Sequence, residues 1–270
     1  MRFLVAGGAG FMGSNFARYL LASYGDAEVL VYDKLTYAGR LENLRGLEGD
    51  RRFRFERGDI CDEERLYSVV SSFQPDVIVN FAAETHVDRS LSEPAPFVRT
   101  NVVGVFTLLE VARRLDAPLL VHVSTDEVYG DIGGGEPVGE DAPFRPSSPY
   151  SASKASGDLL CQSYWRSYRL PVRVVRPSNN YGPYQYPEKL IPKTILRAAR
   201  DLPIPVYGSG SQVRDWLYVE DFCRALDTVI RKGSDGEAYN LPGFNEKTNL
   251  EVVEAILGIL GKPRTLVRFV

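Results

Sequence analysis

The chain has 270 residues, of which 44% are hydrophobic and 25% charged, so it is long enough for a large α/β domain and a smaller lobe. Its 32 basic and 35 acidic residues give a net charge of −3 with no block of either sign, which argues against a nucleic-acid or membrane surface and favours a small-molecule partner. Three widely spaced cysteines (Cys61, Cys161 and Cys223) argue against a disulfide framework or a zinc site, so we expect no metal, no membrane-spanning segment and a cytoplasmic location.

Short apolar strands alternate with segments of helical spacing through the first two thirds of the chain. The predicted strands are 2–6, 29–32, 53–56, 77–80, 119–124 and 172–176. The predicted helices between them are 16–21, 63–73, 102–115 and 152–168. This alternation predicts an α/β fold, with a Rossmann-type doubly wound parallel sheet in a domain that covers residues 1–176.

After Arg176 the chain changes to loops rich in Pro, Gly, Tyr and Asn. These loops surround short predicted helices at 190–199, 219–231 and 250–260. We expect residues 177–270 to form mainly a smaller C-terminal substrate-binding lobe, with some return to the first domain. Earlier in the chain, the glycines at 133–135 predict a loop tip.

A glycine-rich sequence, GGAGFMG, lies between the first predicted strand and the first helix. Gly7, Gly10 and Gly13 permit a tight turn, close approach to a pyrophosphate and close packing of the helix on the sheet. Asp33 follows the second strand, twenty residues after Gly13, where its carboxylate would accept hydrogen bonds from an adenosine ribose. A carboxylate repels a 2′-phosphate, so NAD is favoured over NADP, although Lys34 argues against that preference. The alternative is a structural turn with Asp33 as a loop cap.

Thr125, Asp126 and Glu127 follow an apolar run at 119–123, at the point where a buried parallel strand should end. Ligands of open α/β sheets bind at these carboxyl ends, so two adjacent carboxyl groups there suggest acid and base chemistry. Taken alone, the pair is more simply explained as an Asp that turns the chain and a Glu that faces solvent.

Tyr150 and Lys154 stand four residues apart, near the start of a helix predicted to begin at Ser148 and Pro149, so their side chains share one helical face. A phenol with a pKa of roughly 10 is a poor base at neutral pH, but a nearby ammonium and a nicotinium charge favour the phenolate. Tyr150 is therefore a candidate base. The spacing is common on surface helices, and the preceding dinucleotide motif is what gives it weight.

These motifs resemble those of the dTDP-glucose 4,6-dehydratase family, within the extended short-chain dehydrogenase/reductase superfamily. The matching segments cover nearly the whole chain: GGAGFMG (7–13), YDKLTYAG (32–39), GDICD (58–62), AAETHVDRS (82–90), STDEVYG (124–130), YSASKAS (150–156), RPSNNYGPYQYPEKLIP (176–192) and QVRDWLYVEDF (212–222). The resemblance implies NAD as cofactor, a nucleotide sugar as substrate, and a redox-neutral dehydration in deoxysugar (rhamnose-type) biosynthesis.

The resemblance also implies a role for each catalytic residue. Tyr150, supported by Lys154, takes the proton of the glucosyl 4-hydroxyl, and Thr125 hydrogen-bonds the same oxygen. Glu127 removes the C5 proton, and Asp126 protonates the departing 6-hydroxyl. These roles require Asp126 to hold a proton while Glu127 does not, so their environments must separate the two pKa values.

Further residues are implied to bind the two ligands. Cofactor binding is implied for Gly7, Gly10, Phe11, Met12, Gly13, Asp33, Lys34, Leu35, Thr36, Asp59, Ile60, Phe81, Ala82, Ala83, Thr85, Thr100, Tyr150, Lys154 and Asn180. Substrate binding is implied for Thr85, Thr125, Asn179, Lys189, Leu190, Pro205, Val206, Tyr207, Arg214 and Asn249.

Several of these residues have a structural alternative. Without the resemblance, Asp59, Asn179 and Asn180 are equally well explained as turn formers, and Thr100 as a helix cap. Arg214 and Asp215 could form a surface ion pair. The histidines His86 and His122 do not form a metal-binding pattern, so we expect structural roles for both.

Two other functions remain open at this point. A 4-epimerase or decarboxylase of nucleotide sugars would share Tyr150, Lys154 and the glycine loop, but is not expected to need both Asp126 and Glu127. A non-catalytic NAD-binding regulator would have no reason to keep these groups together. The adjacent carboxyl pair therefore discriminates among the three functions.

Two expectations concern assembly and extent. The segments 102–115 and 152–168 carry apolar residues on more than one face, which predicts burial on the sheet and pairing in a homodimer. Members of the resembled family are expected to continue past the position of Val270 with an Arg/His/Asp-bearing loop. We therefore expect the nucleotide site of this chain to be truncated.

Overall fold

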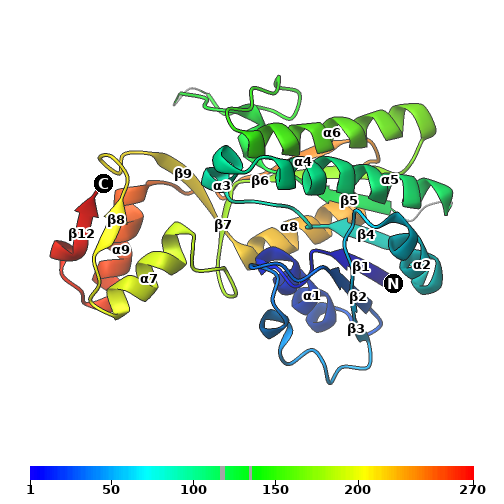
Figure 1. Ribbon diagram of the computed structural model, residues 1–270, viewed down its shortest axis with the longest axis horizontal. Coiled ribbons are helices and arrows are strands. Elements are labelled where there is room, and N and C mark those ends of the chain that lie inside the picture. The colour runs from blue at the N-terminus through cyan, green and yellow to red at the C-terminus, as the bar shows by residue number, and fades with distance from the viewer. Residues whose placement is uncertain (116–118, 134–135) are drawn as a thin grey trace.

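The computed structural model describes residues 1–115, 119–133 and 136–270, so the predicted loop tip at 133–135 lies largely outside the described residues. A seven-stranded parallel sheet forms the centre of the molecule, in the order β10-β6-β5-β4-β1-β2-β3 (Figure 1). Its strands are β1 (Arg2–Ala6), β2 (Glu28–Asp33), β3 (Phe53–Arg57), β4 (Val77–Asn80), β5 (Leu119–Val123), β6 (Val172–Pro177) and β10 (Ala238–Leu241). Strand order reverses between β1 and β4, and ligands of such sheets bind in the crevice at that reversal.

The predicted doubly wound fold is confirmed. All six predicted strands are present, and their ends differ from the prediction by at most one residue. Strand β10 was not predicted, because its sequence Ala-Tyr-Asn-Leu is short and interrupted by a polar residue. As an edge strand paired only with β6 in the sheet, it needs little apolar patterning.

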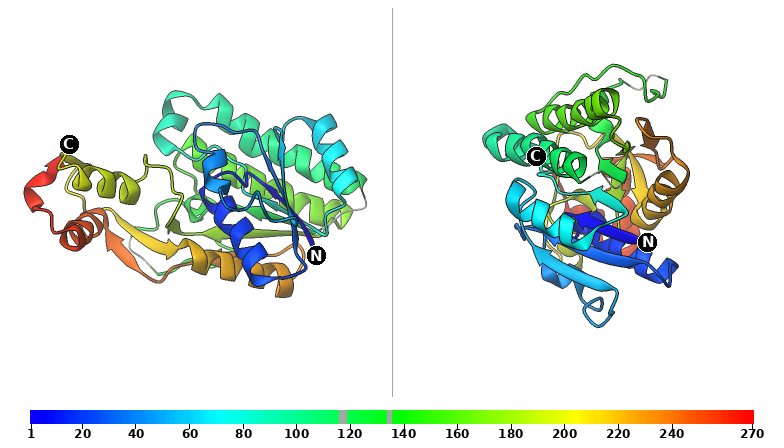
Figure 2. Two further views of the ribbon diagram at one scale, coloured as in Figure 1. Left: turned by 90° about the horizontal axis from the view of Figure 1, so that it is seen from below. Right: turned by 90° about the vertical axis from the view of Figure 1, so that its right-hand side faces the viewer.

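Helices cover both faces of this sheet (Figure 2). On one face lie α1 (Phe11–Ser23) and α8 (Val219–Lys232); on the other lie α2 (Glu63–Phe73), α5 (Gly104–Arg114) and α6 (Pro149–Tyr168). Helix α6 begins as predicted, with Pro149 in its first turn and a capping box between Ser148 and Ser151. Helix α8 and strand β10 come from the last third of the chain and return to the first domain.

The rest of the C-terminal part forms a smaller lobe beside the sheet (Figure 1). Helices α7 (Leu190–Ala199) and α9 (Asn249–Leu260) enclose its small core with the paired strands β8 (Ile204–Val206) and β12 (Val267–Phe269). Strands β7 (Asn179–Tyr181), β9 (Val213–Tyr218) and β11 (Glu246–Thr248) form a three-stranded sheet between the lobe and the domain. The short elements elsewhere are η1 (Leu41–Leu44), α3 (Val87–Ser92), α4 (Ala95–Val98), η2 (Arg99–Val103), η3 (Asp126–Tyr129) and η4 (Arg264–Leu266).

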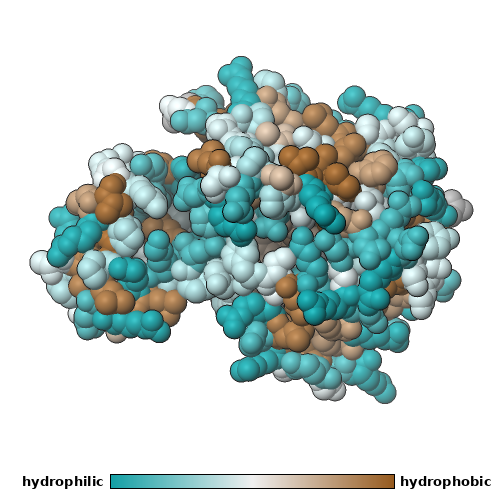
Figure 3. Space-filling model, viewed as in Figure 1, coloured by the Kyte–Doolittle hydropathy of each residue, from teal (hydrophilic) through white to brown (hydrophobic). Residues whose placement is uncertain are grey.

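One helical stretch in the described chain, Ala95–Arg114, is long and apolar enough to cross a membrane by length and composition alone. It consists of α4, η2 and α5, and more than half of its apolar window is buried. It packs against α2 and α6, as the core helix of a soluble protein does. Part of its outer face remains apolar, and Figure 3 shows hydrophobic side chains gathered over this region.

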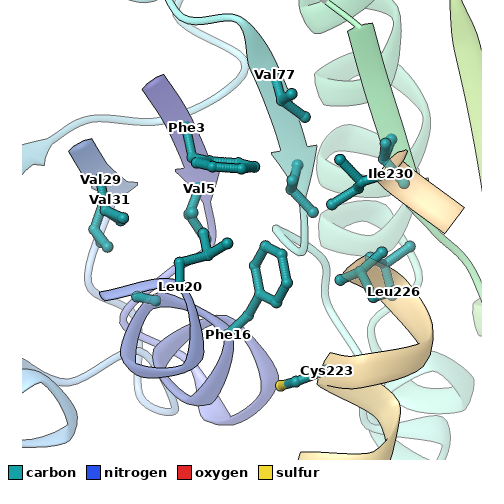
Figure 4. Close-up of a cluster of buried hydrophobic side chains, with 14 of the residues drawn as sticks. Phe3, Val5, Phe16, Leu20, Val29, Val31, Val77, Cys223, Leu226 and Ile230 are labelled. Atoms are coloured by element: carbon teal, nitrogen blue, oxygen red, sulfur yellow. The ribbon is translucent and has the colours of Figure 1, made fainter. Parts of the chain in front are cut away.

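The core between α1, α8 and the sheet fixes the position of the first helix. Phe16 on α1 is fully buried and makes an edge contact with Phe3 on β1, with ring centroids 6.5 Å apart. Leu226 and Ile230 on α8 enclose it from the side of β4 (Figure 4). A tightly packed helix of this kind leaves no room to shift its N-terminus away from the preceding loop.

Gly13 marks the place where α1 touches that loop. A Cβ atom on Gly13 would lie 2.6 Å from the carbonyl oxygen of Gly7 and 2.7 Å from the Cα of Gly8. Both contacts are with backbone, which cannot rotate away. The glycine is therefore required by close packing of helix and turn, as the motif predicted.

We expect Gly13→Ala to destabilise the protein by about 1–3 kcal/mol, although alanine in a helix normally gains about 1 kcal/mol over glycine. Urea denaturation measures this change. Gly25→Ala is the matched control, because no heavy atom among the described residues lies within 4 Å of its added Cβ, and its effect should stay within about 0.5 kcal/mol. Equal or greater stability of Gly13→Ala would show that the close contact is absent.

Candidate active site

A cavity of about 420 Å³ lies between the carboxyl ends of the central strands and the C-terminal lobe. One wall is formed by the loops after β1, β2, β4 and β5. The other is formed by residues 177–191 together with Arg214, Trp216 and Asn249. This size is typical of small-molecule sites, and its position is the one expected for a doubly wound sheet.

The glycine-rich turn lines one end of this cavity. Gly7 has a φ of +74°, and an added Cβ would lie 2.4 Å from the backbone nitrogen of Ala82, so only glycine fits. The described residues give α1 no side-chain cap and no acidic residue in its first turn. Because Phe11, Met12 and Gly13 line the cavity, the amide groups of that turn are available to an anion such as a pyrophosphate.

Asp33 is held rigidly at the end of β2. Its carboxylate accepts hydrogen bonds from the backbone N–H groups of Ala9 at 3.0 Å and Leu35 at 2.8 Å. Burial raises the pKa of Asp33, and these two amide donors oppose the rise. Nearby, Lys34 Nζ donates to Thr100 Oγ1 at 3.3 Å and lies 3.7 Å from Asp59 Oδ2. The fixed carboxylate can accept the hydroxyls of a ribose, and the glycine turn beside it fits the rest of a dinucleotide.

The turn after β5 holds the carboxyl pair. Thr125 Oγ1 accepts from the Glu127 N–H at 3.2 Å and donates to Asp126 Oδ1 at 3.2 Å. Burial, and then the charge of Glu127, raise the pKa of Asp126 to about 6. Burial also raises the pKa of Glu127, but the cations Lys189 and Arg214 oppose that rise. The environment therefore favours a proton on Asp126, in the direction that the implied roles require.

Tyr150 and Lys154 enter the same cavity from the first turns of α6. Burial, and then the charge of Glu127, raise the pKa of Tyr150, while the Thr125 hydroxyl lowers it. Lys154 Nζ donates to the carbonyl oxygen of Val123 at 2.7 Å, and burial lowers its pKa to about 8. Without a further positive charge the phenol keeps its proton, so Lys154 alone does not supply the base expected from the sequence.

A segment of the C-terminal part closes over the mouth of the cavity. The Tyr37 hydroxyl donates to Glu188 Oε1 at 3.1 Å, and the Tyr37 ring contacts that of Tyr186 edge-on at 5.4 Å. Lys189 Nζ donates to the carbonyl oxygen of Thr85 at 3.0 Å. These contacts join the lobe to the loops after β2 and β4, and so hold the two walls of the cavity together.

The structure brings most of the predicted site residues together. Four predicted residues do not line the cavity: Leu35, Pro205, Val206 and Tyr207. Leu35 points into the core against α1, and Val206 is buried in the core of the lobe. The Tyr207 side chain is 65% exposed beside this core. For these four residues, ligand contact stays a prediction.

The structural alternatives are also resolved in part. Asp59 forms a turn through the Cys61 N–H and lines the cavity as well, so both interpretations apply to it. Arg214 faces the cavity, whereas Asp215 accepts from the N–H groups of Gly243 and Asn245, so the two do not form the surface ion pair.

His86 has a structural position at the start of α3. Its Nδ1 accepts from the Arg89 N–H at 3.4 Å, and its Nε2 lies 3.7 Å from Glu188 Oε2. His122 is fully buried on β5, as expected for a core residue. Among the described residues there is no cluster of three His, Cys, Asp or Glu side chains that could hold a metal ion.

Sequence reasoning did not place several polar residues that line the cavity. These are Ser124, Ser178, Gln185, Glu188 and Trp216. Gln185 and Glu188 lie within the matched segment 176–192, whose role has no physical explanation from periodicity. Trp216 lies on β9, a strand that was not predicted, although the matched segment 212–222 contains this residue.

Comparison with known proteins agrees with this geometry. The family model described as GDP-mannose 4,6 dehydratase matches residues 4–264. A dTDP-glucose 4,6-dehydratase of Neisseria meningitidis serogroup B is 51% identical over 269 residues, which cover 96% of this chain and 76% of that protein. Two solved dTDP-glucose 4,6-dehydratases, each with NAD bound, also match the fold.

The solved structure from Bacillus anthracis is 48% identical with a TM-score of 0.94, and it covers 100% of this chain and 84% of its own. A double mutant from Streptomyces venezuelae is 46% identical with a TM-score of 0.96 and the same two coverages. The matched regions include the glycine turn, the carboxyl pair and α6, because both solved structures cover 100% of this chain. This chain therefore belongs to the dTDP-glucose 4,6-dehydratase family of the extended short-chain dehydrogenase/reductase superfamily.

Proposed function

We propose that this chain is an NAD-dependent hydro-lyase that converts dTDP-glucose to dTDP-4-keto-6-deoxyglucose and water. The observation that carries the proposal is the placement of Asp126 and Glu127 in one cavity with Tyr150 and Lys154. A dehydration of this kind needs an acid for the leaving hydroxyl and a base for a carbon-bound proton, in addition to the redox base. The cavity supplies all three groups from two neighbouring elements.

Residues at the glycine end of the cavity bind and orient the cofactor. The first turn of α1 would hold its pyrophosphate, and Asp33 would accept its ribose hydroxyls. Bound NAD would supply a hydride acceptor for C4, the hydride donor for C6 and the positive charge of a nicotinium ring. Lys154 is an ammonium at neutral pH, because its pKa of about 8 lies above 7, and it adds to the positive field at Tyr150.

The protein's own groups move the protons. Tyr150 accepts the proton of the sugar 4-hydroxyl as C4 becomes a ketone, and Thr125 hydrogen-bonds the same oxygen. The ketone acidifies C5, and Glu127 takes its proton. Asp126 gives a proton to the departing 6-hydroxyl, which leaves as water. As C6 regains a hydride, Glu127 returns its proton to C5. One water is lost, and there is no net oxidation.

The nucleotide end of the substrate faces cationic and polar residues of the lobe. Arg214 offers a planar fork of donors for a diphosphate, and Lys189 stands between this end and Glu127. Asn179 and Asn249 also line this part of the cavity. Contact of Leu190 and of Pro205–Tyr207 with the nucleotide belongs to the same proposal.

Assembly and location complete the proposal. The outer face of the α4–α5 stretch and α6 exposes Val98 by 51%, Phe106 by 43% and Leu159 by 55%, and burial of such an apolar face favours a homodimer. Sedimentation over a range of protein concentrations measures this association. A reducing cytoplasm suits the three free cysteines and the nucleotide-sugar substrate.

Incubation with dTDP-glucose and NAD, followed by mass spectrometry, tests the function directly. We expect a product that has lost one water and retains the nucleotide. An unchanged mass with inverted configuration at C4 would indicate an epimerase instead. Loss of carbon dioxide from an acid sugar would indicate a decarboxylase, and no change with any nucleotide sugar would indicate a regulator.

Isosteric amides at the carboxyl pair separate the two proton transfers. We expect Asp126→Asn to spare C4 oxidation and slow water loss by roughly 10²–10⁴-fold, because it removes only the acid. Rapid mixing should therefore show reduced cofactor accumulating by its ultraviolet absorbance. Glu127→Gln should suppress deuterium uptake at C5 from heavy water to a similar degree. Full dehydratase turnover in either variant would contradict the assigned role.

The buried carboxyl of Asp126 should also make stability depend on pH. Its pKa is raised from 3.8 in the unfolded chain to about 6 in the folded one, so ionisation destabilises the fold as pH rises through that window. We expect Asp126→Asn to match wild type near pH 4 and to exceed its unfolding free energy by up to about 3 kcal/mol above pH 7. Denaturation curves at both pH values test this, and a difference that does not grow with pH would contradict it.

A further inference from the structure

A network of buried polar side chains lies near the cavity and joins residues of α6, β6, β5, β4 and η3. Its charged members are Asp158 on α6 and Arg176 on β6, which are 0% and 1% exposed. Arg176 Nε donates to Asp158 Oδ2 at 2.8 Å. Burial of an ion pair costs desolvation free energy unless the polar atoms of both residues are hydrogen-bonded. Neither residue takes part in the proton transfers described above.

On one side of Asp158, the ring of His122 lies between the carboxylate and the residues at the end of β4. The Ala82 N–H donates to Asn80 Oδ1 at 3.1 Å, which turns the Asn80 amide nitrogen toward His122 Nδ1, 3.2 Å away. His122 Nδ1 is therefore the acceptor, and the ring proton lies on Nε2. That nitrogen lies 3.9 Å from Asp158 Oδ1, and neither atom has a hydrogen-bond partner among the described residues.

On the other side, hydrogen bonds connect Asp158 to the turn that carries the carboxyl pair. Arg176 Nη1 donates to the Tyr129 hydroxyl at 2.6 Å and to the carbonyl oxygen of Glu140 at 2.9 Å. Tyr129 is the last residue of η3, which begins at Asp126, and its hydroxyl donates to Asn240 Oδ1 at 2.8 Å. The carboxylate is thus hydrogen-bonded to the catalytic turn through Arg176 and Tyr129, whereas its other oxygen only lies beside His122.

Asp158 also lies one helical turn after Lys154, on the same face of α6. Gly157 beside it allows close packing, because a Cβ there would lie 3.1 Å from His122 Nε2 and 3.1 Å from the carbonyl oxygen of Asn101. The sequence thus places a negative charge behind the buried ammonium of Lys154, on the side away from the cavity.

We propose that Asp158 is a positioning residue of the reaction, whose buried carboxylate keeps Lys154 charged and, through Arg176 and Tyr129, holds the catalytic turn in place. The proposal rests on the proposed function for its kinetic consequence, but its electrostatic claim concerns Lys154 alone. Burial lowers the pKa of Lys154 to about 8, and the charge of Asp158 is the main effect that opposes this fall. Without that charge the ammonium would lose its proton closer to neutral pH.

Other titratable groups also face this cluster, and each could in principle change the pKa of Lys154. They are His122 on β5, Tyr129 on η3, Glu140 on the following loop, Arg176 on β6, and Tyr150 and Cys161 on α6. Burial keeps His122 neutral, because it lowers the pKa of that ring well below its usual value. Burial also raises the pKa of Cys161, which keeps its thiol protonated. Removal of the Asp158 charge should therefore change the pKa of Lys154.

The test is Asp158→Asn in the NAD-loaded protein, with two measurements. Titration of lysine side chains by carbon NMR, with the Lys154 signal assigned from Lys154→Arg, should show its pKa lowered by roughly one unit. The alkaline limb of kcat/KM for dTDP-glucose should move to lower pH by the same amount, with about a fivefold loss at pH 8. A purely structural role would lower stability without moving either titration.

Asp227→Asn is the matched control, because Asp227 is 6% exposed on α8 and accepts from Arg231 Nε at 3.0 Å, away from the cavity. It should lose stability and keep the wild-type titration. If Asp158→Asn does not fold, Asp158→Asn with Arg176→Gln removes the guanidinium that would otherwise be left unpaired, and this double variant should show the same shift. If a folded variant shows the wild-type pKa for Lys154, the proposal is wrong. If the Lys154 pKa shifts but the wild-type protein does not turn over dTDP-glucose, only the proposed function is contradicted.

Discussion

Desolvation of two neighbouring carboxyl groups is the constraint around which this site is arranged. Asp126 and Glu127 leave β5 side by side in a largely buried turn, and each makes ionisation of the other less favourable. An isolated domain would meet this cost by opening the turn to water. Here the lobe supplies Lys189 and Arg214, which oppose the rise in the pKa of Glu127. The second lobe is therefore part of the electrostatics of the catalytic turn as well as a surface for the nucleotide.

The parallel sheet makes this arrangement possible. Because every central strand ends at the same edge, the carboxyl pair after β5, Asp33 after β2 and the glycine turn after β1 reach one cavity without long loops. Helix α6 follows in the chain and packs across this edge, so Tyr150 and Lys154 approach from the opposite side. A capped, rigid helix fixes both side chains relative to the turn, which a mobile loop would not do.

Much of this could be predicted from the sequence, because buried parallel strands are continuous apolar runs and the glycine turn has a fixed spacing to Asp33. Strand β10 and the strands of the lobe could not, because edge strands and three-residue strands carry little periodicity. The contact of Tyr37 with Glu188 joins residues 151 positions apart, and no local pattern encodes such a pair. The ionisation of Tyr150 was predicted from a neighbouring ammonium together with a nicotinium charge, and in the protein alone burial and the Glu127 charge oppose it.

The opposition to ionisation of Tyr150 follows from how charge is distributed in the site. Lys154 bonds to the carbonyl oxygen of Val123, and the turn after that strand holds two acids, so the protein alone leaves Tyr150 protonated. Tyr150 therefore acts as a base only when a positively charged ring is bound beside it. Behind Lys154, the Asp158 carboxylate balances its charge without facing the cavity, whereas Lys189 and Arg214 balance Glu127 from the front. The two walls therefore set the protonation of the carboxyl pair, whereas the phenol needs a further positive charge beside it.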